Sequence, residues 1–101
     1  MTSRAPQLSR AEVDQRIAEI RNKMDELDGR LVALLNERAS CASEIGHLKD
    51  LVGLEIYQPD REIEVLRNVR SQNNGPLAGD AVARLFERII DEARRLERST
   101  G

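Results

Sequence analysis

Residues 13–49, VDQRIAEIRNKMDELDGRLVALLNERASCASEIGHLK, decide the fold of this chain. Their apolar side chains recur in alternating steps of four and three, which is typical of one long α-helix with an apolar stripe. The stripe consists of Val13, Ile17, Ile20, Met24, Leu27, Leu31, Leu34, Cys41, Ile45 and Leu48. Arg38 occupies the one stripe position that lacks an apolar side chain. Burying a guanidinium costs free energy unless an anionic group pairs with it, so Arg38 indicates that this helix binds another molecule or group.

The start of the long helix has its own signal. Ser9 is followed three residues later by Glu12, which is the spacing of a capping box. We predict a helix from this point to about Lys49 or Leu51. Gly46 lies close to the stripe, and its missing side chain lets another backbone approach there.

Two shorter helices complete the predicted fold, which is all-α. Residues 59–71 begin with a proline and acidic side chains, which suit the first turn of a helix. Residues 77–98 carry an apolar face at helical spacing and follow a turn at 72–76. Residues 1–8 are polar and are predicted to be a disordered tail, so the helical domain is expected to span 9–98.

Composition narrows the class of protein. The 101 residues carry a formal net charge of -2, which gives no reason to expect nucleic acid or an anionic membrane as partner. One cysteine fits a reducing compartment, and the first ten residues contain no apolar run typical of a signal peptide. We therefore expect a cytoplasmic protein without a membrane span. Met1 and the short polar tails favour a stand-alone chain.

The length of the first helix predicts an oligomer. A helix of about 38 residues is about 57 Å long, whereas a compact domain of this size has a radius of gyration near 13 Å, about a quarter of that length. The apolar stripe would therefore stay bare along much of the helix. A second copy of the chain would cover it, so we predict an intertwined helical homodimer.

Three cations border one face of this helix: Arg21, Arg38 and Lys49. Arg21 is about 25 Å from Arg38 along the axis, too far for both to touch one small ligand within a chain. In an antiparallel dimer, Arg21 of one chain approaches Arg38 of the other. The resulting site would be cationic and walled by apolar side chains, which suits a small dianion.

These polar residues also have plainer interpretations. Arg38 would form a structural bridge with a buried acid, and the other two cations would be ordinary solvated charges. Glu97 would then be exposed, and Cys41 would be a small core residue. His47 has no cysteine or histidine companions, so no metal site is expected. The sequence contains no Ser-His-Asp set and no glycine-rich phosphate loop, and no cofactor is expected.

Five short motifs add to this pattern. They are IRxxMDxLD from Ile20, LxxLLxER ending at Arg38, IGxxK ending at Lys49, YxPxRExEVL from Tyr57, and LFxxIIxxARxLE ending at Glu97. Together they resemble the helical class of chorismate mutases, and the resemblance covers about residues 13–98. It implies a three-helix chain in an interlocked dimer with two active sites, which rearranges chorismate to prephenate on the route to phenylalanine and tyrosine.

The resemblance also implies roles for the cations. Arg38 and the partner subunit's Arg21 would hold the two substrate carboxylates. Lys49 would contact a carboxylate and the ether oxygen of the breaking bond. Glu62 would bind the ring hydroxyl, and Arg61 would support that end of the site.

At three implied substrate-binding positions the sequence departs from some members of that family. Gln58 stands where certain relatives have aspartate near the ring hydroxyl, and Ala93 stands where some have serine. Glu97 stands where some have glutamine, and the resemblance places it facing the ether oxygen. An ionised carboxylate cannot donate a hydrogen bond, so we expect Glu97 to act in its protonated form and activity to fall as pH rises.

Three other functions fit the same residues. An isochorismate-pyruvate lyase shares the implied fold and breaks a similar ether. A helical dimer without catalysis would explain the stripe but not Arg38. A chain that is weakly active alone and boosted by another enzyme of the aromatic pathway would use its charged C-terminal tail as the contact.

Overall fold

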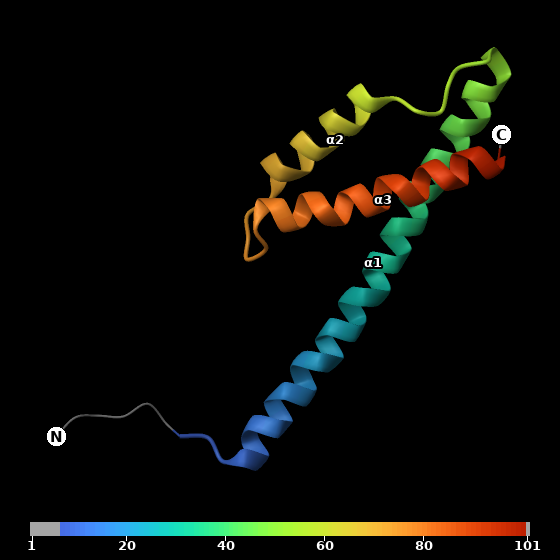
Figure 1. Cartoon of the computed structure of the whole chain (residues 1–101). Coiled ribbons are helices and arrows are strands. Elements are labelled where there is room, and N and C mark those ends of the chain that lie inside the picture. The colour runs from blue at the N-terminus through green and yellow to red at the C-terminus, as the bar shows by residue number, and fades with distance from the viewer. Residues whose placement is uncertain (1–6, 101) are drawn as a thin grey trace. The chain divides into compact units, whose positions relative to one another are not determined.

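The computed structural model describes residues 7–100. These residues form three helices and no strand: α1 (Arg10–Val52), α2 (Pro59–Gln72) and α3 (Gly79–Thr100) (Figure 1). The all-α prediction and the three predicted helices are confirmed. The predicted tail over residues 1–8 lies largely outside the described residues, and the domain limits of 9–98 stay a prediction.

Ser9 is confirmed as the N-cap of α1, and Glu12 lies beside it as the predicted capping box requires. The backbone N–H of Glu12 donates to Oγ of Ser9 at 3.1 Å, and this hydroxyl donates to Oε1 of Glu12 at 3.1 Å. The first bond satisfies a backbone N–H that the first turn of a helix leaves without a partner, and the second joins the two side chains to each other. The cap therefore starts α1 one residue after Ser9.

A glycine turn ends α1. Gly53 has a φ of +70°, in the left-handed region that glycine adopts without a steric penalty. Its N–H donates to the carbonyl of Asp50 at 3.4 Å, and the N–H of Leu54 donates to the carbonyl of Lys49 at 2.9 Å. This pair of bonds is the Schellman arrangement. It turns the chain back toward the last turn of α1, next to Lys49.

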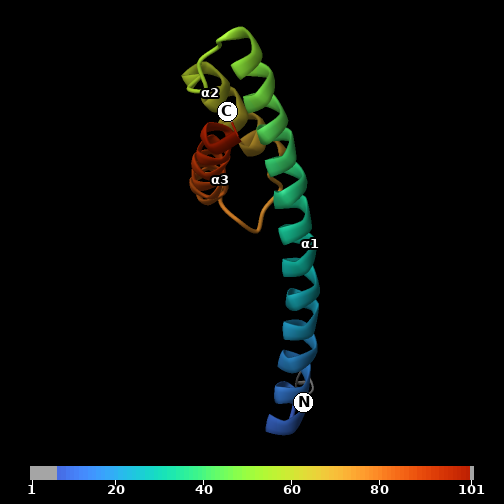
Figure 2. The same ribbon diagram turned by 90° about the vertical axis from the view of Figure 1, so that its right-hand side faces the viewer.

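Helices α2 and α3 form an antiparallel pair, and both views show them side by side (Figure 1, Figure 2). Asn73 holds the connection between them: its Nδ2 donates to the carbonyl of Leu77 at 2.8 Å, and its Oδ1 accepts from the N–H of Gly75 at 3.1 Å. Across the turn, Arg70 pairs with Asp80 at 2.7 Å. This guanidinium lowers the pKa of Asp80 through a hydrogen bond and its charge.

The described chain divides after Leu34 into two units. In the first unit, the large apolar side chains of α1 between Ile17 and Leu34 remain 40–59% exposed. In the second unit, the buried apolar side chains are small or medium in size: Ala42, Val65 and Ala83. Within residues 7–100, none of the helices carries an apolar stretch that could cross a membrane.

Candidate active site

The second unit contains a cavity of about 360 Å³ that is lined by all three helices and the connection between α1 and α2. Seven of the eight residues predicted for the site line this cavity: Arg38, Lys49, Gln58, Arg61, Glu62, Ala93 and Glu97. The eighth, Arg21, lies in the first unit and its side chain is exposed. The fold thus brings together predicted residues from distant parts of the sequence.

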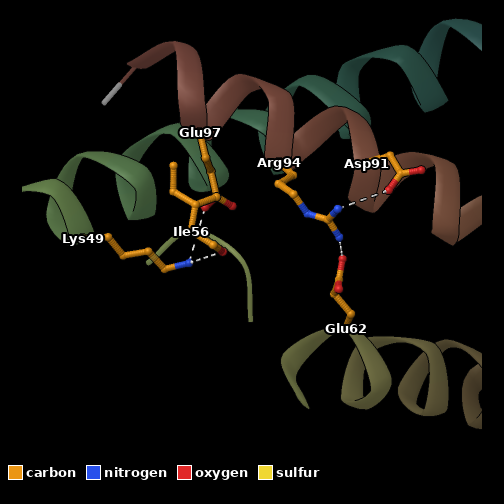
Figure 3. Close-up of polar contacts among 6 residues, drawn as sticks. All are labelled: Lys49, Ile56, Glu62, Asp91, Arg94 and Glu97. Carbon is orange, nitrogen blue, oxygen red and sulfur yellow. Dashed lines mark hydrogen bonds and ion pairs between the residues drawn. The ribbon is translucent and has the colours of Figure 1, made fainter. Parts of the chain in front are cut away.

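Lys49 and Glu97 both line the cavity and pair with each other (Figure 3). The Lys49 ammonium donates to the carbonyl of Ile56 at 3.2 Å and to Oε2 of Glu97 at 3.4 Å. The two side chains are only 12% and 14% exposed. The interpretation of Lys49 and Glu97 as ordinary solvated charges is therefore wrong.

The approach of α3 to α1 at this point depends on a glycine. A Cβ atom added to Gly46 would lie 3.0 Å from Cα and 3.1 Å from the carbonyl oxygen of Glu97. Because these are backbone atoms, α3 would have to shift to make room for any side chain. The expectation that another backbone approaches at Gly46 is confirmed. Since Lys49 lies one turn further along α1, this contact also governs the distance between Lys49 and Glu97.

Arg38 lies on α1 about three turns before Lys49, and its side chain is partly buried. Within residues 7–100, its guanidinium has no acidic partner at ion-pair distance. The alternative of a structural bridge within the chain is therefore not supported. Cys41 lies between these two cations in the sequence, lines the cavity and is exposed in the single chain.

The start of α2 also contributes to the lining. Pro59 occupies the first helical position, and the backbone N–H groups of Arg61 and Glu62 both donate to the carbonyl of Gln58, at 3.1 and 3.3 Å. Three side chains at the start of α2 therefore line the cavity, namely those of Gln58, Arg61 and Glu62. The Arg61 side chain also pairs with Glu64 on the exposed surface.

Arg94 is the cavity residue that sequence reasoning missed. It pairs with Glu62 across α2 and α3 and lies 3.8 Å from Asp91 (Figure 3). Its guanidinium carbon is 5.0 Å from the centre of the Tyr57 ring. In the sequence it belongs to a run of cations near the end of a helix, which the helix dipole explains. A signal was present, because Arg94 precedes Glu97 by three residues and so shares its helix face.

The charges of the lining suit a small anion. Four cations and two carboxylates line the cavity: Arg38, Lys49, Arg61, Arg94, Glu62 and Glu97. Aliphatic side chains, among them Ile45, Ile56 and Ile90, complete the wall. Charged hydrogen bonds are strong in such partly desolvated surroundings. Within residues 7–100, no group of three or more His, Cys, Asp or Glu side chains is placed to hold a metal ion.

Comparison with known proteins gives a consistent result. The family model of chorismate mutase type II matches residues 20–98. The bifunctional chorismate mutase/prephenate dehydratase of Neisseria gonorrhoeae is 41% identical over 86 residues, which are 85% of this chain and 23% of that protein. The chorismate mutase of Methanocaldococcus jannaschii is 27% identical over 85 residues, which are 83% of this chain and 86% of that protein. This chain thus spans about a quarter of the length of the bifunctional relatives it matches.

A solved structure is also similar. The structure of chorismate mutase (Form II) from Thermus thermophilus has a TM-score of 0.81 and 34% sequence identity to this chain. The match covers 82% of this chain and 94% of that one. The helical arrangement described above is therefore one that a chorismate mutase adopts.

Proposed function

Because this chain belongs to the chorismate mutase type II family, we propose that it rearranges chorismate to prephenate. The observation that carries the proposal is the cavity itself, where Arg38, Lys49 and Glu97 converge from two helices. Chorismate is a dianion with an enol ether, and these side chains are the kinds that bind carboxylates and an ether oxygen.

The proposed mechanism is one of positioning. The rearrangement forms one carbon–carbon bond and breaks one carbon–oxygen bond in the same substrate, so it requires no nucleophile or proton transfer. The enzyme must hold the substrate in a compact chair with the two reacting carbons close together. In the proposed dimer, Arg38 and the partner subunit's Arg21 would hold the two carboxylates.

Stabilisation of the transition state is assigned to Lys49 and Glu97. Negative charge grows on the ether oxygen as the carbon–oxygen bond breaks, and preorganised donors in a dry site stabilise such charge. The Lys49 ammonium is already held by the carbonyl of Ile56, so it is aimed before substrate arrives. Glu97 would contribute a hydrogen bond only in its protonated form.

The end of the cavity near α2 is assigned to the substrate ring. Glu62 would accept a hydrogen bond from the ring hydroxyl, with Gln58 beside it and Arg61 supporting that end. Ala93 lines the cavity but has no hydroxyl, so it would contribute contact without a hydrogen bond.

The proposal includes an intertwined homodimer. Large side chains along α1 remain exposed, including Ile20 at 58%, Leu31 at 55% and Leu34 at 59%. An exposed stripe of this length is typical of an interface, and a second copy is the simplest partner with a matching stripe. The cytoplasmic location and a contact with another enzyme of the aromatic pathway stay predictions.

The decisive test is the loss of chorismate absorbance with purified protein, measured at pH 5 and pH 8. The wild type should form prephenate at both pH values, while Arg38→Ala should be folded by circular dichroism and nearly inactive. If chorismate is unchanged at both pH values, the function is refuted, and turnover of isochorismate would then identify a lyase.

A further inference from the structure

Arg94 connects three elements around the cavity. It lies on α3, and its ion-pair partner Glu62 lies on α2 (Figure 3). Its aromatic neighbour Tyr57 lies in the connection between α1 and α2. The side chains of Arg94 and Glu62 are 25% and 23% exposed, so both are largely removed from water. Both also line the cavity.

The contacts of Arg94 restrict the position of its guanidinium. A guanidinium is planar, with donors along its edges and faces that attract aromatic rings. One edge pairs with Glu62, a second nitrogen lies 3.8 Å from Asp91, and the carbon lies 5.0 Å from the centre of the Tyr57 ring. With these contacts made together, the group has little freedom to rotate.

The pair in turn restricts the carboxylate of Glu62. Glu62 reaches the cavity on a flexible side chain from the first turn of α2. A carboxylate accepts several hydrogen bonds, so pairing with Arg94 leaves it able to accept one more from a ligand. An acceptor held in one place discriminates between ligands better than a mobile one, because less freedom is lost on binding.

We propose that Arg94 is a positioning residue that fixes the Glu62 carboxylate for recognition of the substrate's ring hydroxyl, with the Tyr57 ring as the platform for its guanidinium. This inference rests on the proposed function, and it assigns substrate discrimination to the α2–α3 side of the cavity. Arg94 acts through Glu62 and does not itself contact the reacting atoms.

The test compares chorismate with an analogue that lacks the ring hydroxyl. Arg94→Met keeps the aliphatic part of the side chain but removes the charge and the donors. It should lower kcat/KM for chorismate by about 10- to 100-fold, the loss typical of one hydrogen bond to a charged group. The loss for the analogue should be less than about threefold, because the analogue makes no hydrogen bond to Glu62.

Three further variants separate positioning from a structural role. Arg94→Lys keeps the charge without the planar donors, so its loss should be intermediate. Glu62→Gln combined with Arg94→Met should be no slower than Glu62→Gln alone, because both changes affect the same contact. Arg95→Met is the matched control, since Arg95 is the next residue of α3 and its side chain is 68% exposed. It should behave as the wild type.

Each outcome decides the inference. Equal losses for both substrates, or additive losses in the double variant, would overturn it and leave Arg94 as a structural link between α2 and α3. If Arg94→Met fails to fold, the comparison of Arg94→Lys on the two substrates gives the same decision. If the wild type converts chorismate and Arg94→Met equals it, the inference alone fails. A wild type that leaves chorismate unchanged refutes the proposed function and the inference with it.

Discussion

From Ile17 to Leu34, α1 presents large apolar side chains that stay 40–59% exposed, and none of its residues 10–34 is buried. Beyond Leu35, the same helix buries Ala42 and Gly46, and the neighbouring face lines a cavity. The buried residues of this second part are small, while its large apolar side chains Ile45, Leu48 and Leu51 stay 47–67% exposed. Small residues let another helix of the same chain approach closely, whereas a row of large ones is buried only when a second surface with a matching shape covers it.

The largest expected loss of activity comes from a substitution in the part of α1 that lines the cavity. Lys49→Ala should lower kcat for chorismate by at least about 100- to 1,000-fold, because the ether oxygen would lose its main donor. The matched control is Lys23→Ala, in the exposed part of the same helix, which should remain active. Steady-state kinetics with both variants checks this, and a Lys49→Ala enzyme with near-normal kcat would remove Lys49 from the mechanism.

A mixing experiment tests whether the two parts of α1 meet in a dimer. Arg21→Ala and Arg38→Ala should each be nearly inactive. After the two variants are unfolded and refolded together, half the dimers should be mixed, each with one intact site, so about a quarter of wild-type activity should return. Refolding each variant alone is the control. If no activity returns on mixing, Arg21 does not act across an interface.

A charged substitution tests whether the exposed stripe of α1 is a dimer interface. Leu31→Glu should convert the dimer to monomer, because a carboxylate would be buried against apolar side chains. Ala33→Glu places the same group on the opposite side of the helix and should leave the dimer intact. Light scattering coupled to size-exclusion chromatography measures both masses. A Leu31→Glu dimer would place the interface elsewhere on the chain.

One glycine in each part of α1 tests whether the close approach of α3 is needed for catalysis. Gly46→Ala should lower kcat about tenfold, because the added Cβ would push α3 and Glu97 away from Lys49. Gly29→Ala meets no atom within 4 Å, so it should stabilise the helix by about 0.5–1 kcal/mol without loss of activity. Steady-state kinetics of both variants measures kcat, and thermal unfolding measures the change in stability. Equal activity of the two would show that the close approach is not needed for catalysis.

The smallest expected effect is at the turn between α2 and α3. Because Arg70 lowers the pKa of Asp80, this ion pair stabilises the folded state at neutral pH and loses that contribution as pH falls through the lowered pKa. Asp80→Asn should therefore lower Tm slightly at pH 7, and the difference should vanish in acid or high salt. A difference that persists in acid would have another origin.

The helix ends were predictable because their signals are local. A capping box, a proline in the first turn and a glycine with positive φ each act within a few residues, and α1, α2 and α3 begin and end close to the predicted positions. The candidate site was only partly predictable. The cations of α1 were identified from the stripe, whereas Glu62 and Glu97 were identified by resemblance alone.

Arg94 shows why some site residues escape a reading of the sequence. A local cause, the helix dipole, already explains a cation near the end of a helix, so the sequence offers no reason to look for a second role of Arg94. Its partner Glu62 lies on a different helix, and its aromatic neighbour Tyr57 lies in a loop. Contacts between elements depend on how those elements pack.

The all-helical chain, its long apolar stripe and the arginine within the stripe follow from the sequence, because helical periodicity is visible in a linear string of residues. Helix packing, in contrast, was needed to show that Lys49 meets Glu97, 48 residues away, and that Gly46 lets α3 approach α1 closely enough for that contact. Hydrogen bonds within a helix join neighbours in sequence, whereas packing brings together residues that are far apart along the chain.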